Sequence, residues 1–313
     1  APDEVVTDNI PLDKGKISLM EGGTRVPLII VGPDIPAGVD SDVMVSGLDF
    51  YPTILSLTGS EKPAGKQFDG LDVSTLLLKD PTDPNLVREA DGNVRDTMVW
   101  HFPNSSALMS TIRIGDYKLI RNYGEQRPDS DRPFLELYHL YDSTSGKSVR
   151  VDIEEAHNLA EQEPERAEEL NRRLTEILSG MKASYPYWNP MHSRPLPHKD
   201  EVPAMVSCEQ EVGNVVFEYR EHGAKVVRAD LIYTVNGGQR IEEWFRKEAT
   251  LLPDTKGRAT LPDGTTHFFI NLIDENNFLV SYPSVVDASN PSKDARLFAE
   301  KALKVITPEE VRK

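Results

Sequence analysis

The strongest constraint on the fold is an uninterrupted apolar run at residues 26–32, VPLIIVG. The run is rich in β-branched residues and ends at a glycine. Both alternating sides of such a strand would be apolar, so the run predicts a strand buried on both faces, as in the sheet of an α/β domain. The GPDIPAG segment that follows it predicts a turn.

Two further segments complete the α/β part, which we predict over residues 1–90. Residues 48–59, LDFYPTILSLTG, predict a short helix with Gly59 as its C-terminal cap. Residues 68–78, FDGLDVSTLLL, predict a turn and a short amphipathic piece.

Residues 91–190 predict an antiparallel sheet followed by one long helix. The segments TMVWHFP, TIRIGDYKLIRNY and FLELYHLYD combine β-branched and aromatic residues with turn residues between them. In the helix at 163–181, Pro164 suits the first turn. Its apolar residues follow one helical stripe: Ala167, Leu170, Leu174, Ile177, Leu178 and Met181.

The remainder predicts a linker and a second domain. Residues 191–205 lie in a proline-rich stretch and predict a linker. Short strand-like runs separated by LPDGTTH and VNGGQR predict a β-sandwich-like accessory domain over residues 206–313, with a charged helix from about residue 291.

Charge and cysteine content exclude several classes of function. The net charge of -16 argues against unspecific nucleic-acid binding, although a local cationic pocket can still bind an anionic substrate. Cys208 is the single cysteine, so an intrachain disulfide and a cysteine-based zinc site are excluded. No apolar run is long enough to span a bilayer.

The stretch GKISLMEGGTRVP at 15–27 allows two interpretations. In the first, the glycine pair makes a tight turn, Glu21 pairs with Arg25, and Lys16 is solvated. In the second, the glycine-rich backbone lets a loop approach a ligand. Lys16 would then present a point charge to an anion or give a proton to a leaving oxygen.

This stretch and its continuation, GKISLMEGGTRVPLIIVGPDIPAG, resemble the type I sulfatases, the arylsulfatase-like enzymes of the alkaline phosphatase superfamily. The resemblance continues through SGLDFYPTILSLTG, FDGLDVSTLLL, GDYKLIRNY, ELYHLYD and HNLA, in the order of the family and over about the first 190 residues. It implies a partial sulfatase α/β domain, followed by the small C-terminal antiparallel sheet of that family.

The resemblance also implies roles for individual residues. Lys16 matches the lysine that contacts the sulfate ester and stabilises the leaving group. The residues that match the scaffold of the family's lysine loop are Glu21, Gly22, Gly23 and Arg25. His101, in VWHFP, matches a position near the pocket mouth and is a candidate substrate-binding residue, with a packed or solvent-facing histidine as the alternative.

The family's nucleophile and metal ligands are expected outside this chain. The resemblance implies a formylglycine formed in a C/S-x-P-S/A-R motif and a divalent cation, usually calcium, bound by carboxylates and an Asn. Ser289 begins SNPSK, which has Lys in place of Arg and follows the lysine loop, so a helix cap explains it better. Asp8-Asn9 lacks the glycine that follows the family's metal-binding pair, and no metal ligand is assigned to this chain.

The sequence therefore predicts the C-terminal part of a sulfatase that hydrolyses sulfate monoesters on a carbohydrate, and this chain alone is expected to be inactive. The alternatives are a phosphate or phosphonate ester hydrolase of the same superfamily and a noncatalytic glycan-binding module. The expected partners are a sulfated substrate, an N-terminal sulfatase portion, and other copies of the chain through exposed strand edges. The resemblance implies a periplasmic or extracellular parent protein.

Overall fold

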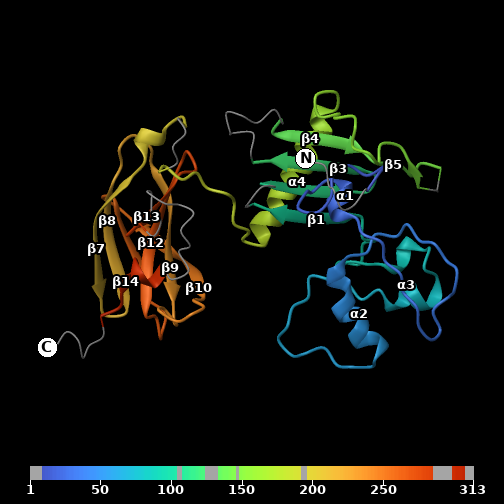
Figure 1. Cartoon of the computed structure of the whole chain (residues 1–313), viewed down its shortest axis with the longest axis horizontal. Helices are drawn as coiled ribbons and strands as arrows, with labels where there is room; N and C mark the ends of the chain where they lie inside the picture. The colour runs from blue at the N-terminus through green and yellow to red at the C-terminus, as the bar shows by residue number, and fades with distance from the viewer. Residues whose placement is uncertain are drawn as a thin grey trace. The chain divides into compact units, whose positions relative to one another are not determined.

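The structure is a computed structural model that describes residues 9–103, 108–123, 133–145, 148–191, 196–284 and 298–306. The chain divides into two compact units, Ala1–Pro186 and Tyr187–Lys313 (Figure 1). Its described part combines a large antiparallel sheet with few helices. No helix in that part is both long and apolar enough to cross a membrane.

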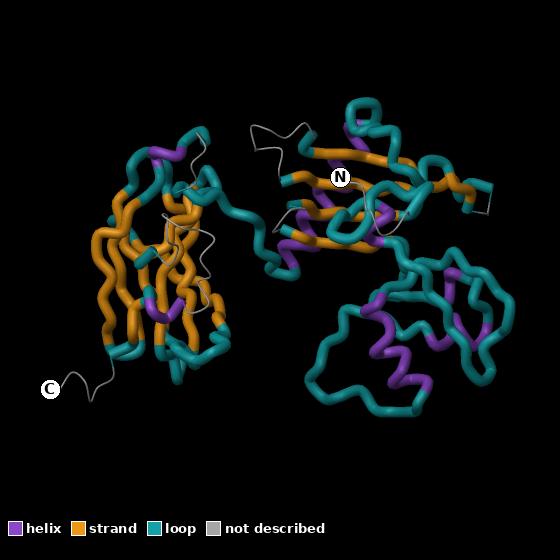
Figure 2. Tube along the Cα trace, in the orientation of Figure 1, coloured by secondary structure: helices purple, strands orange, loops and turns teal. Residues whose placement is uncertain are grey.

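The first unit contains a four-stranded antiparallel sheet whose strands follow chain order. Strands are drawn in orange in Figure 2. Its strands are β1 Thr97–Phe102, β2 Met109–Ile114, β3 Tyr117–Asn122 and β4 Leu135–His139. Between β2 and β3, Gly115 has a φ of 54°, a conformation that glycine adopts without steric cost. A short ribbon follows, formed by β5 Tyr141–Asp142 and β6 Val149–Arg150. The predicted meander is confirmed.

The predicted long helix is also confirmed, as α4 Pro164–Gly180. The apolar stripe of α4 packs on one face of the sheet, where Leu174 and Leu178 join Ile112, Leu119 and Leu137 in one buried cluster. The prediction is wrong for Met181, which is 62% exposed, because it lies after the last helical turn.

The opposite face of the same sheet is covered by the segment around the short helix α1 Glu21–Thr24. The helix lies over this face, and Leu19 and Met20 join Ile120 and Tyr138 in a second buried cluster (Figure 1). Since side chains alternate along a strand, β3 contributes to both layers. The sheet is therefore covered by α4 on one side and by the α1 segment on the other.

The helix predicted at 48–59 is confirmed as α2 Phe50–Leu57, preceded by the 3₁₀ turn η1 Gly47–Asp49. Gly59 ends it with a φ of 65°, and the Ser60 N–H donates to the Leu55 carbonyl at 2.8 Å. The helix α3 Ser74–Lys79 and the 3₁₀ turn η2 Pro84–Leu86 follow. The buried carboxylate of Asp49 accepts two hydrogen bonds from Arg95, at 2.6 and 2.8 Å, which ties η1 to the segment before β1.

The prediction of a buried strand at residues 26–32 is wrong. The segment forms no strand, and its apolar side chains are exposed, with Ile29 at 87% and Val31 at 89%. A strand needs neighbouring strands to hydrogen-bond its backbone, and the strand ladders of the described residues do not include this segment. The apolar, β-branched composition favours a strand, but none of the sheets of the described residues pairs with this segment.

The second unit is built on an eight-stranded sheet in the order β13-β12-β9-β10-β11-β8-β7, with β14 paired to β12. Its strands are β7 Ala204–Glu211, β8 Asn214–Arg220, β9 Val226–Thr234, β10 Trp244–Leu252, β11 Lys256–Thr260, β12 His267–Asp274, β13 Leu279–Tyr282 and β14 Leu303–Lys304. β10 pairs with β9 through residues 244–249 and with β11 through residues 250–252. Side chains from both halves of the sheet, including Phe217, Leu231 and Ile270, meet in one core.

The second unit begins before the predicted linker at 191–205, and its last described residues do not form the predicted helix. The Trp188 N–H donates to the Asn277 carbonyl at 2.9 Å, and the Trp188 carbonyl accepts from Leu279 at 2.9 Å, so this residue is fixed to the sheet. The 3₁₀ turn η3 Lys199–Glu201 precedes β7. Residues 291–297 and 307–313 of the predicted final helix lie outside the described residues. Between them the prediction is wrong, because residues 298–306 form the 3₁₀ turn η4 Phe298–Glu300 and β14, whose Leu303 packs on the core.

Candidate functional site

The loop that carries Lys16 has a constrained backbone. Lys14 and Ile17 have φ values of 60° and 80°, and the Ser18 N–H donates to the Gly15 carbonyl at 3.1 Å. A left-handed conformation is costly for a β-branched residue such as Ile17, by about 1–3 kcal/mol, so surrounding contacts must hold it. The Lys16 side chain between these two residues is exposed.

The glycine pair allows α1 to lie directly on this loop. The Gly22 N–H donates to the Asp13 carbonyl at 3.0 Å. A Cβ at Gly22 would lie 2.3 Å from the Lys14 carbonyl oxygen, and one at Gly23 would lie 2.0 Å from the Ser18 carbonyl oxygen. Any side chain at either position would push the loop away from the helix, because these are backbone atoms that cannot swing aside.

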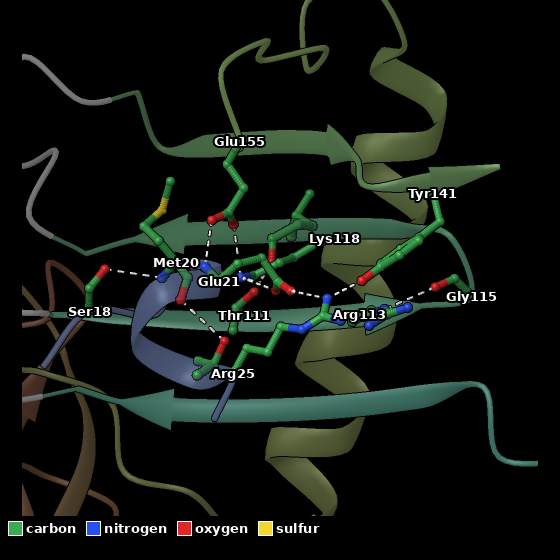
Figure 3. A network of polar contacts seen from close by, with 12 residues as sticks. Ser18, Met20, Glu21, Arg25, Thr111, Arg113, Gly115, Lys118, Tyr141 and Glu155 are labelled. Carbon is green, nitrogen blue, oxygen red and sulfur yellow. Dashed lines mark hydrogen bonds and ion pairs between the residues drawn. The ribbon is translucent and has the colours of Figure 1, made fainter. Parts of the chain in front are cut away.

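A buried ionic cluster lies directly behind α1 (Figure 3). The Lys118 ammonium lies 2.9 Å from Glu21 Oε1 and 2.8 Å from Glu155 Oε1. The other carboxylate oxygen of Glu155 accepts the backbone N–H of Glu21 at 2.5 Å. Three distant segments therefore meet here: the first residue of α1, the second residue of β3, and the loop before α4.

The cluster holds two carboxylates and one ammonium. Burial is the main cause that raises the pKa of Glu155, and the charge and hydrogen bond of Lys118 only partly oppose it. A second cation stands beside the cluster, since Arg25 Nη1 lies 3.8 Å from Glu21 Oε2 and also donates to the Tyr141 hydroxyl. The predicted pairing of Glu21 with Arg25 is confirmed, but the shorter contact of Glu21 is with Lys118.

Sequence reasoning missed Lys118 and Glu155. The signal for Lys118 was present in YKLIRN, where a lysine stands in a strand next to apolar residues. A lysine in such a strand predicts an edge or surface position unless a carboxylate partner is known. The partners are supplied by segments far away in the sequence, and local patterns do not reveal them.

His101 belongs to a different set of contacts. Its Nδ1 lies 2.5 Å from Ser110 Oγ, and its Nε2 lies 2.7 Å from the Ser184 carbonyl oxygen. Ser110 Oγ also lies 2.7 Å from the Tyr123 hydroxyl. Ser110 is fully buried, so this serine–histidine pair cannot present a nucleophile to a substrate. A substrate would have to displace one of the two hydrogen bonds of His101 to reach a ring nitrogen.

The described residues do not fit a metal ion. Across these ranges, no group of three or more His, Cys, Asp or Glu side chains is arranged to hold one. Asn9 uses its side-chain amide to donate to the Lys14 carbonyl at 3.1 Å, which assigns it to the loop. The two sequence positions weighed above, Asp8 and Ser289, lie outside the described residues.

The chain is similar in sequence to several curated sulfatases. The chain is 28% identical over 211 residues to a sulfatase of Formosa agariphila, a match that covers 63% of the chain and 34% of the relative. It is 31% identical over 143 residues to human arylsulfatase G, covering 42% of the chain and 25% of the relative. It is 32% identical over 111 residues to pig N-acetylgalactosamine-6-sulfatase, covering 35% and 19%. No family model matches the chain.

These matches establish a class: the chain contains a sulfatase-like region that corresponds to the C-terminal part of such proteins. The chain spans about a third or less of the length of the curated relatives quoted above. The relatives carry names of sulfuric ester hydrolases.

Proposed function

We propose that this chain is the C-terminal part of an enzyme that hydrolyses sulfate monoesters, and that Lys16 contacts the sulfate group and the leaving oxygen. The observation that carries the proposal is the sequence similarity to a sulfatase over 211 residues. The loop that carries Lys16 adds support, because close backbone contacts at Gly22 and Gly23 hold it in place.

The chemistry suits an ammonium group. Cleavage of a sulfate ester leaves negative charge on the departing oxygen, and a positive group held beside that oxygen stabilises the transition state more than the ground state. Lysine supplies a compact charge and three donors on a flexible stem. Because the Lys16 side chain is exposed, no internal contact has to break before it reaches a substrate.

A sulfated carbohydrate is the substrate class that we favour. Support comes from the relative named N-acetylgalactosamine-6-sulfatase, whose name describes a sulfated amino sugar. His101 stays a candidate for substrate contact at the end of β1, provided that one of its two hydrogen bonds opens.

We propose that the nucleophile and the metal ligands are supplied by another part of the protein. A formylglycine and a calcium ion are expected for this family, and the described residues do not fit a metal. We therefore propose that a further sulfatase portion completes the site and covers the apolar segment at 26–32. We expect the complete protein to be periplasmic or extracellular.

Turnover of 4-methylumbelliferyl sulfate tests the proposal. The purified chain alone should not hydrolyse it, whereas the complete polypeptide should. In the complete polypeptide, Lys16→Ala should lower kcat by about 10²–10³, the cost of removing one electrostatic group at a developing charge. Lys66→Ala is the matched control, because Lys66 is an exposed loop lysine of the same unit.

Two outcomes would contradict the proposal. Turnover at the wild-type rate by Lys16→Ala would show that Lys16 does not have the proposed catalytic role. Faster hydrolysis of 4-methylumbelliferyl phosphate than of the sulfate would instead favour the phosphate ester alternative.

A further inference from the structure

The orientation of Lys16 depends on a chain of contacts that begins deep in the sheet. Lys118 extends from β3, and its side chain is completely buried, as is that of Glu155. Buried charges are costly unless they are paired, so a cluster of this kind persists only where its geometry is closely held. In this structure it holds one element, the short helix α1.

Glu21 connects the buried ionic cluster to α1. Its carboxylate pairs with Lys118 at 2.9 Å, and its backbone N–H donates to Glu155 at 2.5 Å. The helix has only four residues, and its N-cap residue Met20 makes no side-chain capping hydrogen bond. Such a short helix has little stability of its own, so its position is set by the groups that bind it.

The helix in turn fixes the Lys16 loop. Gly22 donates to the Asp13 carbonyl, and Gly23 lies so close to Gly15 and Ser18 that no Cβ would fit. The left-handed backbone at Ile17, beside Lys16, is unfavourable by itself and needs this support.

We propose that Lys118 and Glu155 are positioning residues for Lys16, acting through Glu21 and α1. The proposal rests on the proposed function for its catalytic meaning, but the mechanical link can be tested without activity. Neither residue touches the substrate: both are buried behind the helix. Their effect on the reaction passes through the loop.

Hydrogen exchange in this chain tests the mechanical link. Lys118→Met and Glu155→Asn should accelerate amide exchange in residues 13–24 by about tenfold or more, while exchange in β2 and β3 changes less. Asparagine tolerates the left-handed φ of 55° at position 155 but is too short to reach Glu21. If Lys118→Met fails to fold, Glu155→Asn decides the result.

Arg121→Met is the matched control. Arg121 lies on the same strand, but it binds Asn171 and Thr175 of α4 on the other face of the sheet. In this variant, amide exchange at residues 13–24 should not accelerate more than amide exchange in β3. Equal acceleration in all variants, or wild-type exchange at 13–24 in Glu155→Asn, would overturn the proposal.

Turnover by the complete polypeptide tests the link to Lys16. Glu155→Asn should lower kcat by about 10- to 100-fold when Lys16 is present, the range expected for a small displacement of a catalytic group. In a Lys16→Ala background, the same substitution should change kcat by less than about twofold. Equal losses in both backgrounds would show a general structural effect instead. Absence of sulfatase activity would refute the proposed function and leave the exchange result standing.

Discussion

Lys118 Nζ lies 2.8 Å from Glu155 Oε1, and both side chains are completely shielded from solvent. The carboxylate comes from a loop and the ammonium from the second position of a strand. Together with Glu21 they join α1 to the sheet. A pair of this kind is strongly destabilising to break, because the remaining charge stays buried and uncompensated.

The close approach of Gly23 to the loop predicts a steric effect. Gly23→Ala should destabilise the first unit by about 1–3 kcal/mol, since its Cβ would fall 2.0 Å from the Ser18 carbonyl oxygen. Gly180→Ala, in α4 with nothing within 4 Å of the new Cβ, should be neutral or slightly stabilising. Denaturant-dependent hydrogen exchange of unit 1 measures both. Equal stability of the two variants would contradict the clash.

The ion pair between Asp49 and Arg95 predicts a dependence on pH. Burial alone would raise the pKa of Asp49, but hydrogen bonds from Arg95, Leu71 and Ser46 and the charge of Arg95 together lower it below 3.8. The stability that this group contributes is therefore present above its unfolded pKa of 3.8 and is lost as the pH falls through the lower folded value.

Asp49→Asn should accordingly destabilise unit 1 by about 3–5 kcal/mol at pH 7, because Arg95 loses its buried partner. The difference from the wild type should narrow as the pH falls below about 3.8. Denaturant-dependent hydrogen exchange at residues 47–60 across this pH range checks both. A difference that stays constant with pH would show that the pKa of Asp49 is not lowered.

The exposed apolar segment predicts association of the isolated chain. An exposed apolar segment whose backbone belongs to no sheet of the described residues favours association with other chains. The double substitution Ile29→Asp and Val31→Asp should shift sedimentation velocity profiles towards the monomer. Val212→Asp is the control, since Val212 is 99% exposed but stands alone in the turn between β7 and β8. Monomeric behaviour of the wild-type chain at high concentration would argue against this role.

The environment of Cys208 predicts low reactivity. Burial, and to a lesser extent the charge of Glu209, raise the pKa of its thiol to about 12. At pH 8 roughly one molecule in 10⁴ then carries the reactive thiolate. Labelling by a disulfide reagent should be slow in the folded chain and fast in guanidinium chloride. Rapid labelling of the folded chain would contradict the raised pKa, because Cys208 is only partly buried.

Several elements could be predicted from local sequence patterns alone. The apolar stripe of α4, its first-turn Pro164 and the Gly59 cap of α2 are signals within a few residues, and the structure confirms them. The strands of the meander were predictable for the same reason, because alternation and turn residues are adjacent in the chain. The importance of Gly22 and Gly23 could also be anticipated, although the atoms that exclude a Cβ could not.

What the sequence by itself determined was the local conformation of some elements: the helices α2 and α4, the meander strands and the glycine positions that a close backbone approach requires. The tertiary structure decided which residues are buried. It left VPLIIVG exposed, because a strand is completed only by neighbours that share its hydrogen bonds. It also buried Lys118, because two carboxylates from distant segments compensate the charge there. Burial and pairing depend on partners far away in the chain, and no local pattern contains them.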